Sequence, residues 1–310
     1  MARAPDRAAI DALAKALEGV RESLGTDPSP AIVRRVRDAL AEHATALEQV
    51  RAATDPVAMP RASFDPADPK AIGRMVSIAL LAQQMMPLQD VKPAYGSGVY
   101  AIYYRGDHPL YSAISRTETP IYVGKADPAK DDASNAREQG AKLTGRLIEH
   151  AGTIKTAEAY SKLPQGLSPI SLADFTCRRL VCATNAQLVA EKHLIRTFWP
   201  VWNSETKACW GMSKHGDSAN TRANKRSPWD VVHPGRAWAL DAKLKDSLTP
   251  DQIADRIEET LKKYSPRKDH AALLEEMLAG FRQDAEVKEQ EAPPVGDEAS
   301  GPDAEEAGDE

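Results

Sequence analysis

The chain has 310 residues, of which 42% are hydrophobic and 27% charged, so it can bury one core of good size and a small second one. Its first residues do not have the form of a signal peptide, and its longest apolar run, residues 75–82, is too short to span a bilayer. Three cysteines without scaffold spacing indicate reduced thiols, so we expect a cytoplasmic protein with no membrane partner. A zinc site that combines these cysteines with His193 or His215 would lack paired CxxC spacing.

The formal net charge of −5 is distributed unevenly along the chain. Residues 283–310 contain eleven acidic residues and one lysine, a charge of −10, whereas residues 92–245 contain 22 basic and 14 acidic residues, a charge of +8. A basic middle followed by an acidic end is typical of a nucleic-acid binder whose tail competes for the basic face. The alternative is a tail that is only a solubilising, disordered extension.

Helical periodicity dominates the first 95 residues. Apolar residues with helical spacing run from Ile10 to Leu24 and from Ile32 to Val50, which predicts a helical hairpin over residues 1–60. Prolines concentrate in residues 53–70, and a helix follows over about 70–86, closed by Pro87. Residues 61–95 are therefore predicted to be a linker and a helix that lead into the core.

From residue 96 the apolar period changes to that of strands. Residues 98–104, about 120–124 and 175–183 are predicted strands, with a helix that starts near Thr144 between the last two. Another helix, N-capped by Thr184 or Asn185, is expected to end at Pro200. The prediction is an α+β fold over residues 96–245: a small antiparallel three-stranded sheet flanked by helices, with added N- and C-terminal helices.

The remaining segments are a loop, helices and a tail. Residues 203–236 are rich in Gly, Asn, Lys and Arg and are predicted to form loops. A capping box at Thr249 opens the C-terminal helices of residues 246–282. A disordered acidic tail is expected over residues 283–310.

One carboxylate in the predicted helix before Pro200 lies where an apolar residue would be expected. Glu191 is in the middle of a stripe formed by Leu188, Leu194, Ile195 and Phe198. Burying an unpaired carboxylate is costly, so Glu191 either forms an ion pair, with Arg146 or Lys192, or faces a pocket that holds a cation. Mg²⁺ suits such a pocket because it needs only one or two carboxylates besides water and phosphate oxygens.

Two strand tyrosines and a helical Arg/His pair complete a set of candidate catalytic groups. Arg146 and His150 are four residues apart and share one helix face; an Arg fork suits a phosphate oxygen, and an imidazole can take or pass a proton. Taken alone, this pair is as consistent with a solvated helix face. The phenols of Tyr100 and Tyr122 are poor bases at neutral pH unless a cation or base assists them, and Lys125 and His150 are possible assistants.

These residues together resemble the signature of the GIY-YIG nucleases. Gly98-Val99-Tyr100 and Tyr122-Val123-Gly124 correspond to the two motifs, followed by Arg146, Glu191 and an Asn at Asn203. The resemblance implies one Mg²⁺ ion held by Glu191, a Tyr100 that activates or orients water, and an Arg146 that clamps the scissile phosphate. With the possible assistants included, the predicted catalytic residues are Tyr100, Tyr122, Lys125, Arg146, His150, Glu191 and Asn203.

A second block narrows the resemblance to one branch of that superfamily. Residues 200–203 (Pro-Val-Trp-Asn) and 227–236 (Ser-Pro-Trp-Asp-Val-Val-His-Pro-Gly-Arg) are similar to the type II restriction endonuclease branch. Members of this branch act as homodimers or larger assemblies on GC-rich palindromes of the SacII type. The resemblance covers about residues 65–240.

The loop between these two blocks has the composition of a DNA reader. Arg can read guanine, Asn can read adenine, and Lys mostly positions the backbone. The alternative is a solvated basic loop. The predicted DNA-binding residues are Lys207, Lys214, Arg222, Asn224, Lys225, Arg226 and Arg236.

The sequence therefore predicts a Mg²⁺-dependent, site-specific type II restriction endonuclease that acts on double-stranded DNA. We expect a homodimer or larger assembly that functions alongside a DNA methyltransferase, with residues 5–50 as a candidate for oligomerisation or DNA wrapping. One alternative is a structure-specific repair or mobile-element nuclease, although no helix-hairpin-helix or zinc module is evident. Another is a DNA-binding protein without catalysis, although the candidate catalytic residues are all present.

Overall fold

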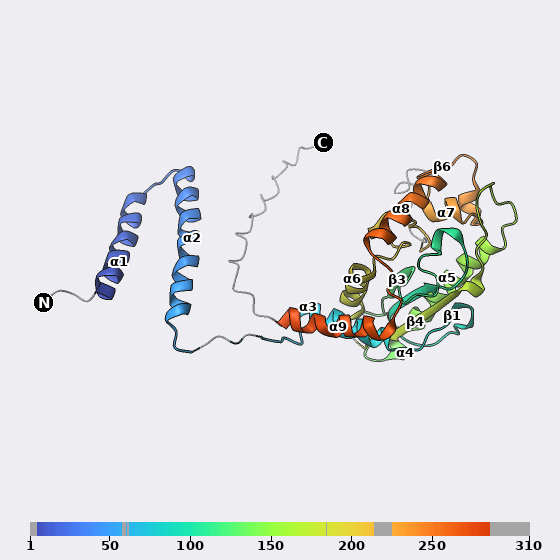
Figure 1. The fold of residues 1–310 in the computed structure, drawn as a ribbon, viewed down its shortest axis with the longest axis horizontal. Coiled ribbons are helices and arrows are strands. Elements are labelled where there is room, and N and C mark those ends of the chain that lie inside the picture. Colours follow the sequence, from blue (N-terminus) through green and yellow to red (C-terminus); the bar gives the residue numbers. More distant parts are fainter. Residues whose placement is uncertain (1–4, 58–59, 61, 184, 214–224, 286–310) are drawn as a thin grey trace, which may run out of the picture. The chain divides into compact units, whose positions relative to one another are not determined.

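A computed structural model describes residues 5–57, 60, 62–183, 185–213 and 225–285 (Figure 1). The chain divides into two compact units, Met1–Arg61 with Val287–Glu310, and Ala62–Glu286. The first unit contains α1 (Pro5–Leu24) and α2 (Pro30–Thr54). Gly25 follows α1 with a φ of +63°, and Pro30 occupies the first position of α2, where its missing N–H is not needed.

The second unit is built on an antiparallel sheet in the order β1-β4-β2-β3. Its strands are β1 (Met86–Pro87), β2 (Gly98–Tyr104), β3 (Tyr122–Ala126) and β4 (Phe175–Val181). The α+β class is confirmed, but the prediction of three strands is wrong, because β1 pairs with the outer edge of β4 as a fourth. The helix expected to reach Pro87, α3 (Pro69–Leu81), ends earlier, because the residue before a proline favours extended backbone.

The central strand β2 is buried on both faces of the sheet. Tyr100, Ile102 and Tyr104 pack into a core shared with α5 (Lys142–Glu158). Their neighbours Val99, Ala101 and Tyr103 belong to a second core, shared with α3, α6 (Gln187–Phe198) and α9 (His270–Ala285). Strand alternation thus places Tyr100 on the α5 side of the sheet and Tyr103 on the other side.

The remaining elements are short, apart from one C-terminal helix. Segment 203–236, predicted to be loop, contains a buried helical turn, α7, and one strand of a parallel pair. The predicted capping box is confirmed at Thr249. These elements are α4 (Ala136–Gln139), α7 (Pro228–Val232), α8 (Pro250–Lys263), β5 (Lys225–Arg226), β6 (Lys245–Asp246) and the 3-10 helices η1 (Leu88–Asp90), η2 (Pro109–Tyr111), η3 (Leu172–Asp174), η4 (Ser204–Thr206) and η5 (Ala237–Leu240).

The helix α6, which carries Glu191, differs from its prediction at one end. It begins at Gln187 with Ala186 as N-cap and no side-chain cap, whereas Thr184 lies outside the described residues. Its C-cap is Trp199, whose left-handed backbone directs its N–H to the Ile195 carbonyl just before Pro200. The predicted end of the helix is therefore confirmed.

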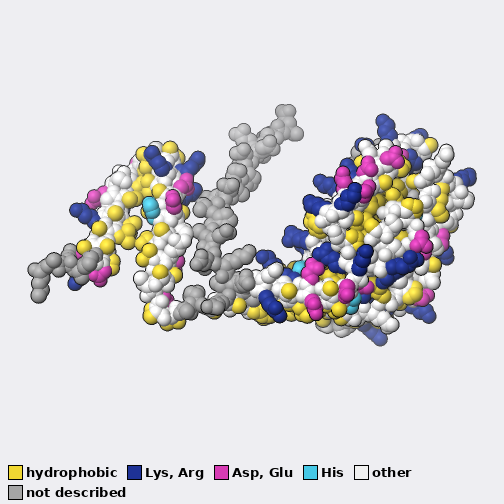
Figure 2. All heavy atoms as spheres, in the orientation of Figure 1, with side chains coloured by type: hydrophobic (Ala, Val, Ile, Leu, Met, Phe, Trp, Pro, Cys, Tyr) yellow, Lys and Arg dark blue, Asp and Glu magenta, His cyan; other side chains and the backbone are white. Residues whose placement is uncertain are grey.

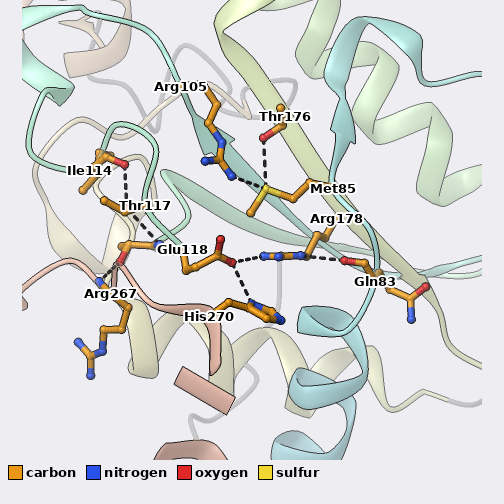
Figure 3. Close-up of polar contacts among 11 residues, drawn as sticks. Gln83, Met85, Arg105, Ile114, Thr117, Glu118, Thr176, Arg178, Arg267 and His270 are labelled. Atoms are coloured by element: carbon orange, nitrogen blue, oxygen red, sulfur yellow. Dashed lines mark hydrogen bonds and ion pairs between the residues drawn. The ribbon is translucent and has the colours of Figure 1, made fainter. Parts of the chain in front are cut away.

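A buried ion pair fastens the C-terminal helices to the sheet (Figure 3). Glu118, in the β2–β3 connection, accepts from Arg178 of β4 at 2.8 Å and contacts His270 of α9 at 3.1 Å. Arg178 also donates to the Gln83 carbonyl, just beyond α3, at 2.9 Å. Arg178 and Glu118 are only 7% and 15% exposed, and with His270 and Gln83 they link four segments of the chain. Among the described residues, no helix has both the length and the apolar character needed to cross a membrane.

Candidate active site

The glycines of the two strand motifs are required by close packing. Tyr100 of β2 lies opposite Gly124 of β3, and a Cβ at Gly124 would lie 2.5 Å from the Tyr100 hydroxyl oxygen. A Cβ at Gly98 would lie 2.0 Å from the Leu180 carbonyl oxygen on β4. Real Cβ atoms do not approach so closely. Gly98 therefore lets the central strand approach β4, and Gly124 makes room for the tyrosine hydroxyl.

The Tyr100 hydroxyl is paired with the imidazole of His150. Its oxygen lies 2.7 Å from His150 Nε2, and both side chains are buried. The ring of Tyr122 completes a group of three, with centroids 6.1 Å from Tyr100 and 5.1 Å from His150. Burial, and next the neighbouring Tyr122, hold the pKa of Tyr100 well above its usual value, although the Arg146 charge opposes them. Tyr100 is therefore a neutral phenol with the His150 imidazole within hydrogen-bond distance of its hydroxyl group.

Asn203 holds the edge strand in place. Its side-chain oxygen accepts from the Val123 N–H and its amide donates to the Val123 carbonyl, both at 2.9 Å. Since β3 is the last strand of the sheet, the amide replaces the missing strand partner at this position. Asn203 is thus a positioning residue for the strand that carries Tyr122.

Arg146 projects from α5 into a half-exposed position. Its guanidinium donates to Glu149 at 2.9 Å and to the Ser213 hydroxyl at 2.7 Å. With 31% of its side chain exposed, it retains access to solvent. The residue four positions on, His150, is buried against Tyr100. The shared helix face therefore brings one solvated cation and one buried imidazole to the same place.

Glu191 lies on α6, partly buried, and no ion pair involves it among the described residues. The sequence left open a pair with Arg146 or Lys192; the structure forms neither. Burial raises the pKa of Glu191 to about 7, the charge of Lys125 acts in the opposite direction, and Glu205 and Asp127 raise it further. A carboxyl group held in this way favours a proton or a cation.

These groups meet in a cleft of about 510 Å³. Four of its lining residues are predicted catalytic residues: Tyr122, Lys125, Arg146 and Glu191. Tyr100, His150 and Asn203 lie behind this lining, in the core. Among the described residues, the lining consists of Tyr122, Lys125, Ala126, Asp127, Ala141, Lys142, Gly145, Arg146, Glu149, Glu191 and Ser213.

A comparison with protein families now identifies the domain. The family model of the Eco29kI GIY-YIG domain matches residues 92–261. The chain belongs to this family. Because this is a GIY-YIG family of restriction endonucleases, the chain carries a nuclease domain whose partner is DNA. The matched segment includes every predicted catalytic residue, whereas α1, α2, α3 and α9 lie outside it. No curated protein matches the chain.

The GIY-YIG cleft contains residues that the sequence did not single out. Asp127 forms an ion pair with Lys125, so Lys125 acts on Glu191 as one half of a pair. Ser213 links Arg146 to the segment after α6, and Glu149 is the second partner of Arg146. Asp127 stands at the start of a loop rich in Asp, Lys and Asn, which is a weak signal. Ser213 has no signal in the sequence.

The donor set of the cleft fits Mg²⁺. In the described part of the chain, no three His, Cys, Asp or Glu side chains surround one metal position, which disfavours a zinc site of four protein ligands there. The three cysteines are buried, and His215 lies outside the described residues. A single carboxylate at Glu191, open to a polar cleft, matches a hard cation that keeps several waters.

The predicted DNA-binding residues of the GIY-YIG domain fall into three groups. Lys207 and Lys225 are exposed, and Arg226 pairs with Asp246 at 2.6 Å. Lys214, Arg222 and Asn224 lie outside the described residues. Arg236 is only 10% exposed, and its guanidinium donates to both oxygens of Asp230 and to two carbonyls, those of Gly211 and Met212. The guanidinium of Arg236 is therefore fully engaged by protein groups, and it joins Gly211 and Met212 to Asp230 of α7.

The block that narrowed the family resemblance forms part of the core. Trp229 and His233 are buried beside Trp202, with ring centroids 5.9 Å and 6.0 Å from it. The His233 Nε2 atom lies 2.6 Å from the Tyr111 hydroxyl. This block therefore supports the cleft from behind and contributes no lining residue to it among those described.

Proposed function

We propose that the chain is a Mg²⁺-dependent type II restriction endonuclease that cuts double-stranded DNA at a specific site. The observation that carries this proposal is the cleft, where Glu191 and Arg146 line an open space and a buried Tyr100–His150 pair lies behind it. A cation site, a phosphate clamp and a proton acceptor are the groups that phosphodiester hydrolysis requires.

Glu191 is the residue that would hold the metal ion. When bound, Mg²⁺ supplies a Lewis acid that polarises the scissile phosphate and stabilises the charge that develops on it. The carboxylate lines the cleft, and its burial is the main cause of its raised pKa. Binding of a divalent cation would offset the cost of keeping this carboxylate ionised.

Arg146 is placed to bind the phosphate that is cut. Its fork lies in the cleft and is partly exposed, and its partners Glu149 and Ser213 line the same space. A guanidinium binds two phosphate oxygens at once and keeps its charge at any working pH. Exchange of the Ser213 or Glu149 contact for a phosphate oxygen would bring that charge onto the transition state.

The phenols and the imidazole form a path for the proton that leaves the attacking water. Tyr122 lines the cleft, whereas Tyr100 is fully buried behind it. In a relay, Tyr122 would take a proton from water as its own proton moves to the Tyr100 oxygen, and the Tyr100 proton would move to His150 Nε2, which is 2.7 Å from that oxygen. Tyr100 thus acts through Tyr122, and His150 is the terminal acceptor of the path.

The site and the assembly follow from the branch that the chain resembles. Each chain has one cleft with this set of groups, so cutting both strands of a palindrome needs a two-fold pair of chains. We therefore include in the proposal a homodimer or larger assembly, a GC-rich palindromic site of the SacII type, and a DNA methyltransferase that protects the host. A methyltransferase gene beside this one would support the last part.

Plasmid cleavage tests the proposal directly. Purified protein is incubated with plasmid DNA in Mg²⁺ or in EDTA, and the ends are sequenced, with Glu191→Gln prepared in parallel to detect a contaminating nuclease. Discrete ends at one sequence, formed only by wild type with Mg²⁺, are expected. Cleavage of branched but not linear duplexes would favour a structure-specific nuclease, and no cleavage of either would overturn the assignment.

A further inference from the structure

The N-terminal helices α1 and α2 present a continuous apolar seam that their own packing does not cover. On α1, the apolar residues follow one another at alternating intervals of three and four, as do the seam residues of α2, the periodicity of coiled-coil a and d positions. The seam consists of Ile10, Leu13, Leu17, Val20 and Leu24 on α1, and of Val33, Val36, Leu40, His43, Leu47 and Val50 on α2.

Most of this seam is exposed. Ile10 and Val50 are 66% and 63% exposed, Leu17 is 46% exposed, and no residue of α2 is buried. Hydrophobic side chains are visible on the surface of both helices (Figure 2). Only Val20, Leu24 and Val36 among the seam side chains are half-buried. In a completed helical bundle these positions form the core. The two helices thus leave exposed most of the core positions that their periodicity specifies.

The positions beside the seam indicate how many helices complete it. Small residues occupy most of the flanking e and g positions, where a two-stranded coiled coil usually has long charged side chains. Alanines there widen the apolar face and let further helices approach closely, as in a four-helix bundle. These residues are Ala9, Ala14, Ala16, Ala39, Ala44, Ala46 and Ala53.

The charge of α1 and α2 distinguishes between the two roles that the sequence leaves open for them, oligomerisation and DNA wrapping. The two helices together contain seven acidic and seven basic residues, so they carry no net positive charge. DNA wrapping needs a surplus of cations, because affinity for the duplex comes largely from phosphate neutralisation. An electrically neutral pair of helices with an open apolar seam fits a protein partner with the same seam.

From these observations we infer that the hairpin of one chain packs against the hairpin of a second copy and forms an intermolecular four-helix bundle. A second copy covers these exposed core positions with the same periodicity and the same small flanking residues. His43 occupies a seam position of α2, so the bundle has one polar layer, which restricts register and number of chains at a cost in affinity. The inference does not depend on the nuclease assignment.

Sedimentation velocity of the full-length protein, without DNA and over a range of concentrations, tests the inference. The test variant carries Leu17→Glu and Leu40→Glu, and the matched control carries Ala12→Glu and Gln49→Glu, which add the same charge on the outer face. Wild type and control are expected to sediment as dimers or larger species. The test variant should self-associate at least ~30-fold more weakly, as for loss of central interface side chains.

A second variant keeps the inference testable if the double glutamate change unfolds the hairpin. His43→Leu replaces the polar layer by an apolar one, so it should tighten self-association, and hydrogen exchange of α1 and α2 should become slower as protein concentration rises. A wild type that is monomeric at all concentrations overturns the inference. A test variant that sediments with the wild-type mass also overturns the inference, even if that variant has lost affinity for DNA. Plasmid cleavage by a monomeric protein would refute the bundle and leave the nuclease assignment in place.

Discussion

Two tyrosine–histidine hydrogen bonds of nearly equal length lie in the nuclease unit, in opposite surroundings. Tyr100 and His150 are 2.7 Å apart behind the cleft, next to Tyr122 and the Arg146 charge. Tyr111 and His233 are 2.6 Å apart within an aromatic cage that includes Trp202. The indole N–H of Trp202 donates to the Tyr111 oxygen at 2.9 Å, which leaves the Tyr111 proton for His233 Nε2 or for Cys209 Sγ at 3.6 Å.

The two Tyr–His pairs differ in whether the groups around them can favour transfer of the proton. Burial holds the pKa of Tyr111 well above its usual value, although the Trp202 hydrogen bond opposes it, and burial holds the pKa of His233 well below its usual value. Around Tyr100, the Arg146 charge lowers the pKa that burial raises, and the cleft admits water and phosphate. A buried Tyr–His pair is therefore a structural element by itself, and it becomes a catalytic candidate where a cation and an open cleft adjoin it.

The largest effect is expected from a change at Glu191, the carboxylate of the cleft. Glu191→Gln keeps the shape of the side chain but removes the charge that would hold Mg²⁺. Since metal assistance is worth several kcal/mol, single-turnover cleavage should fall at least ~10³-fold. DNA binding measured in Ca²⁺ should stay within a few-fold of wild type. Near-wild-type cleavage by this variant would mean that the metal lies elsewhere.

Removal of one hydroxyl from each pair compares them directly. Tyr100→Phe should reduce single-turnover cleavage by ~10²–10³, the usual worth of a proton-transfer group. It should also reduce the free energy of unfolding by ~1–3 kcal/mol, because His150 loses a buried partner. Tyr111→Phe should leave the cleavage rate near wild type. It should reduce the free energy of unfolding by ~1–3 kcal/mol, because the Trp202 N–H and His233 lose a buried partner. Urea unfolding and rapid-quench cleavage of both variants measure the two effects. Equal losses of rate and stability in both variants would make the two pairs equivalent and refute the distinction.

The sequence predicts the parts of this comparison that depend on local pattern. Strand alternation is sufficient to locate β2 and to separate Tyr100 from Tyr103. The apolar stripe predicted around Glu191 is only partly correct, because Leu188 is 46% exposed. Both patterns are properties of a few consecutive residues. The four-stranded sheet was not predictable in the same way, because β1 has two residues and exists only through its pairing with β4.

The remaining features depend on contacts between segments far apart in the chain. Asn203 caps an edge strand eighty residues earlier, and Ser213 meets Arg146 across sixty-seven. Arg236 belongs to a basic loop whose composition is typical of a DNA reader, yet its guanidinium forms an ion pair with Asp230. No spacing rule separates a basic side chain that faces DNA from one that closes a loop. The partners that distinguish them are set by tertiary packing alone.

A smaller effect concerns the pH at which the cleft accepts its cation. The pKa of Glu191 is raised to about 7, so protons compete with Mg²⁺ below that pH. The Mg²⁺ concentration for half-maximal cleavage should therefore rise by up to ~10-fold for each pH unit below about 7, and should level off above it. A half-saturation that is constant between about pH 6 and 8 would show that this carboxyl does not titrate against the metal.

The smallest expected effect is a pH dependence of stability that comes from the buried Tyr111–His233 pair. Because the folded pKa of His233 is depressed, the unfolded chain binds a proton below about pH 6.5 that the folded chain excludes. Stability from this group is therefore complete above about pH 6.5 and is lost as pH falls below it, by at most ~1.4 kcal/mol per pH unit. His108 also has a lowered pKa through burial and lies 5.4 Å away, ring centroid to centroid, so it adds a second contribution of the same sign.

Urea unfolding of wild type, His233→Gln and His108→Gln at about pH 7.5, 6.5 and 5.5 separates these contributions. Each variant should lose less stability than wild type between the two lower values, and the His233 variant should show the larger difference, because His233 is the more deeply buried. Cleavage rates should not show this dependence, since neither imidazole lines the cleft. If His233→Gln kept the full wild-type slope, the sealed histidine would be protonated in the folded state. Its cage would then tolerate charge, and the contrast with the cleft pair would be lost.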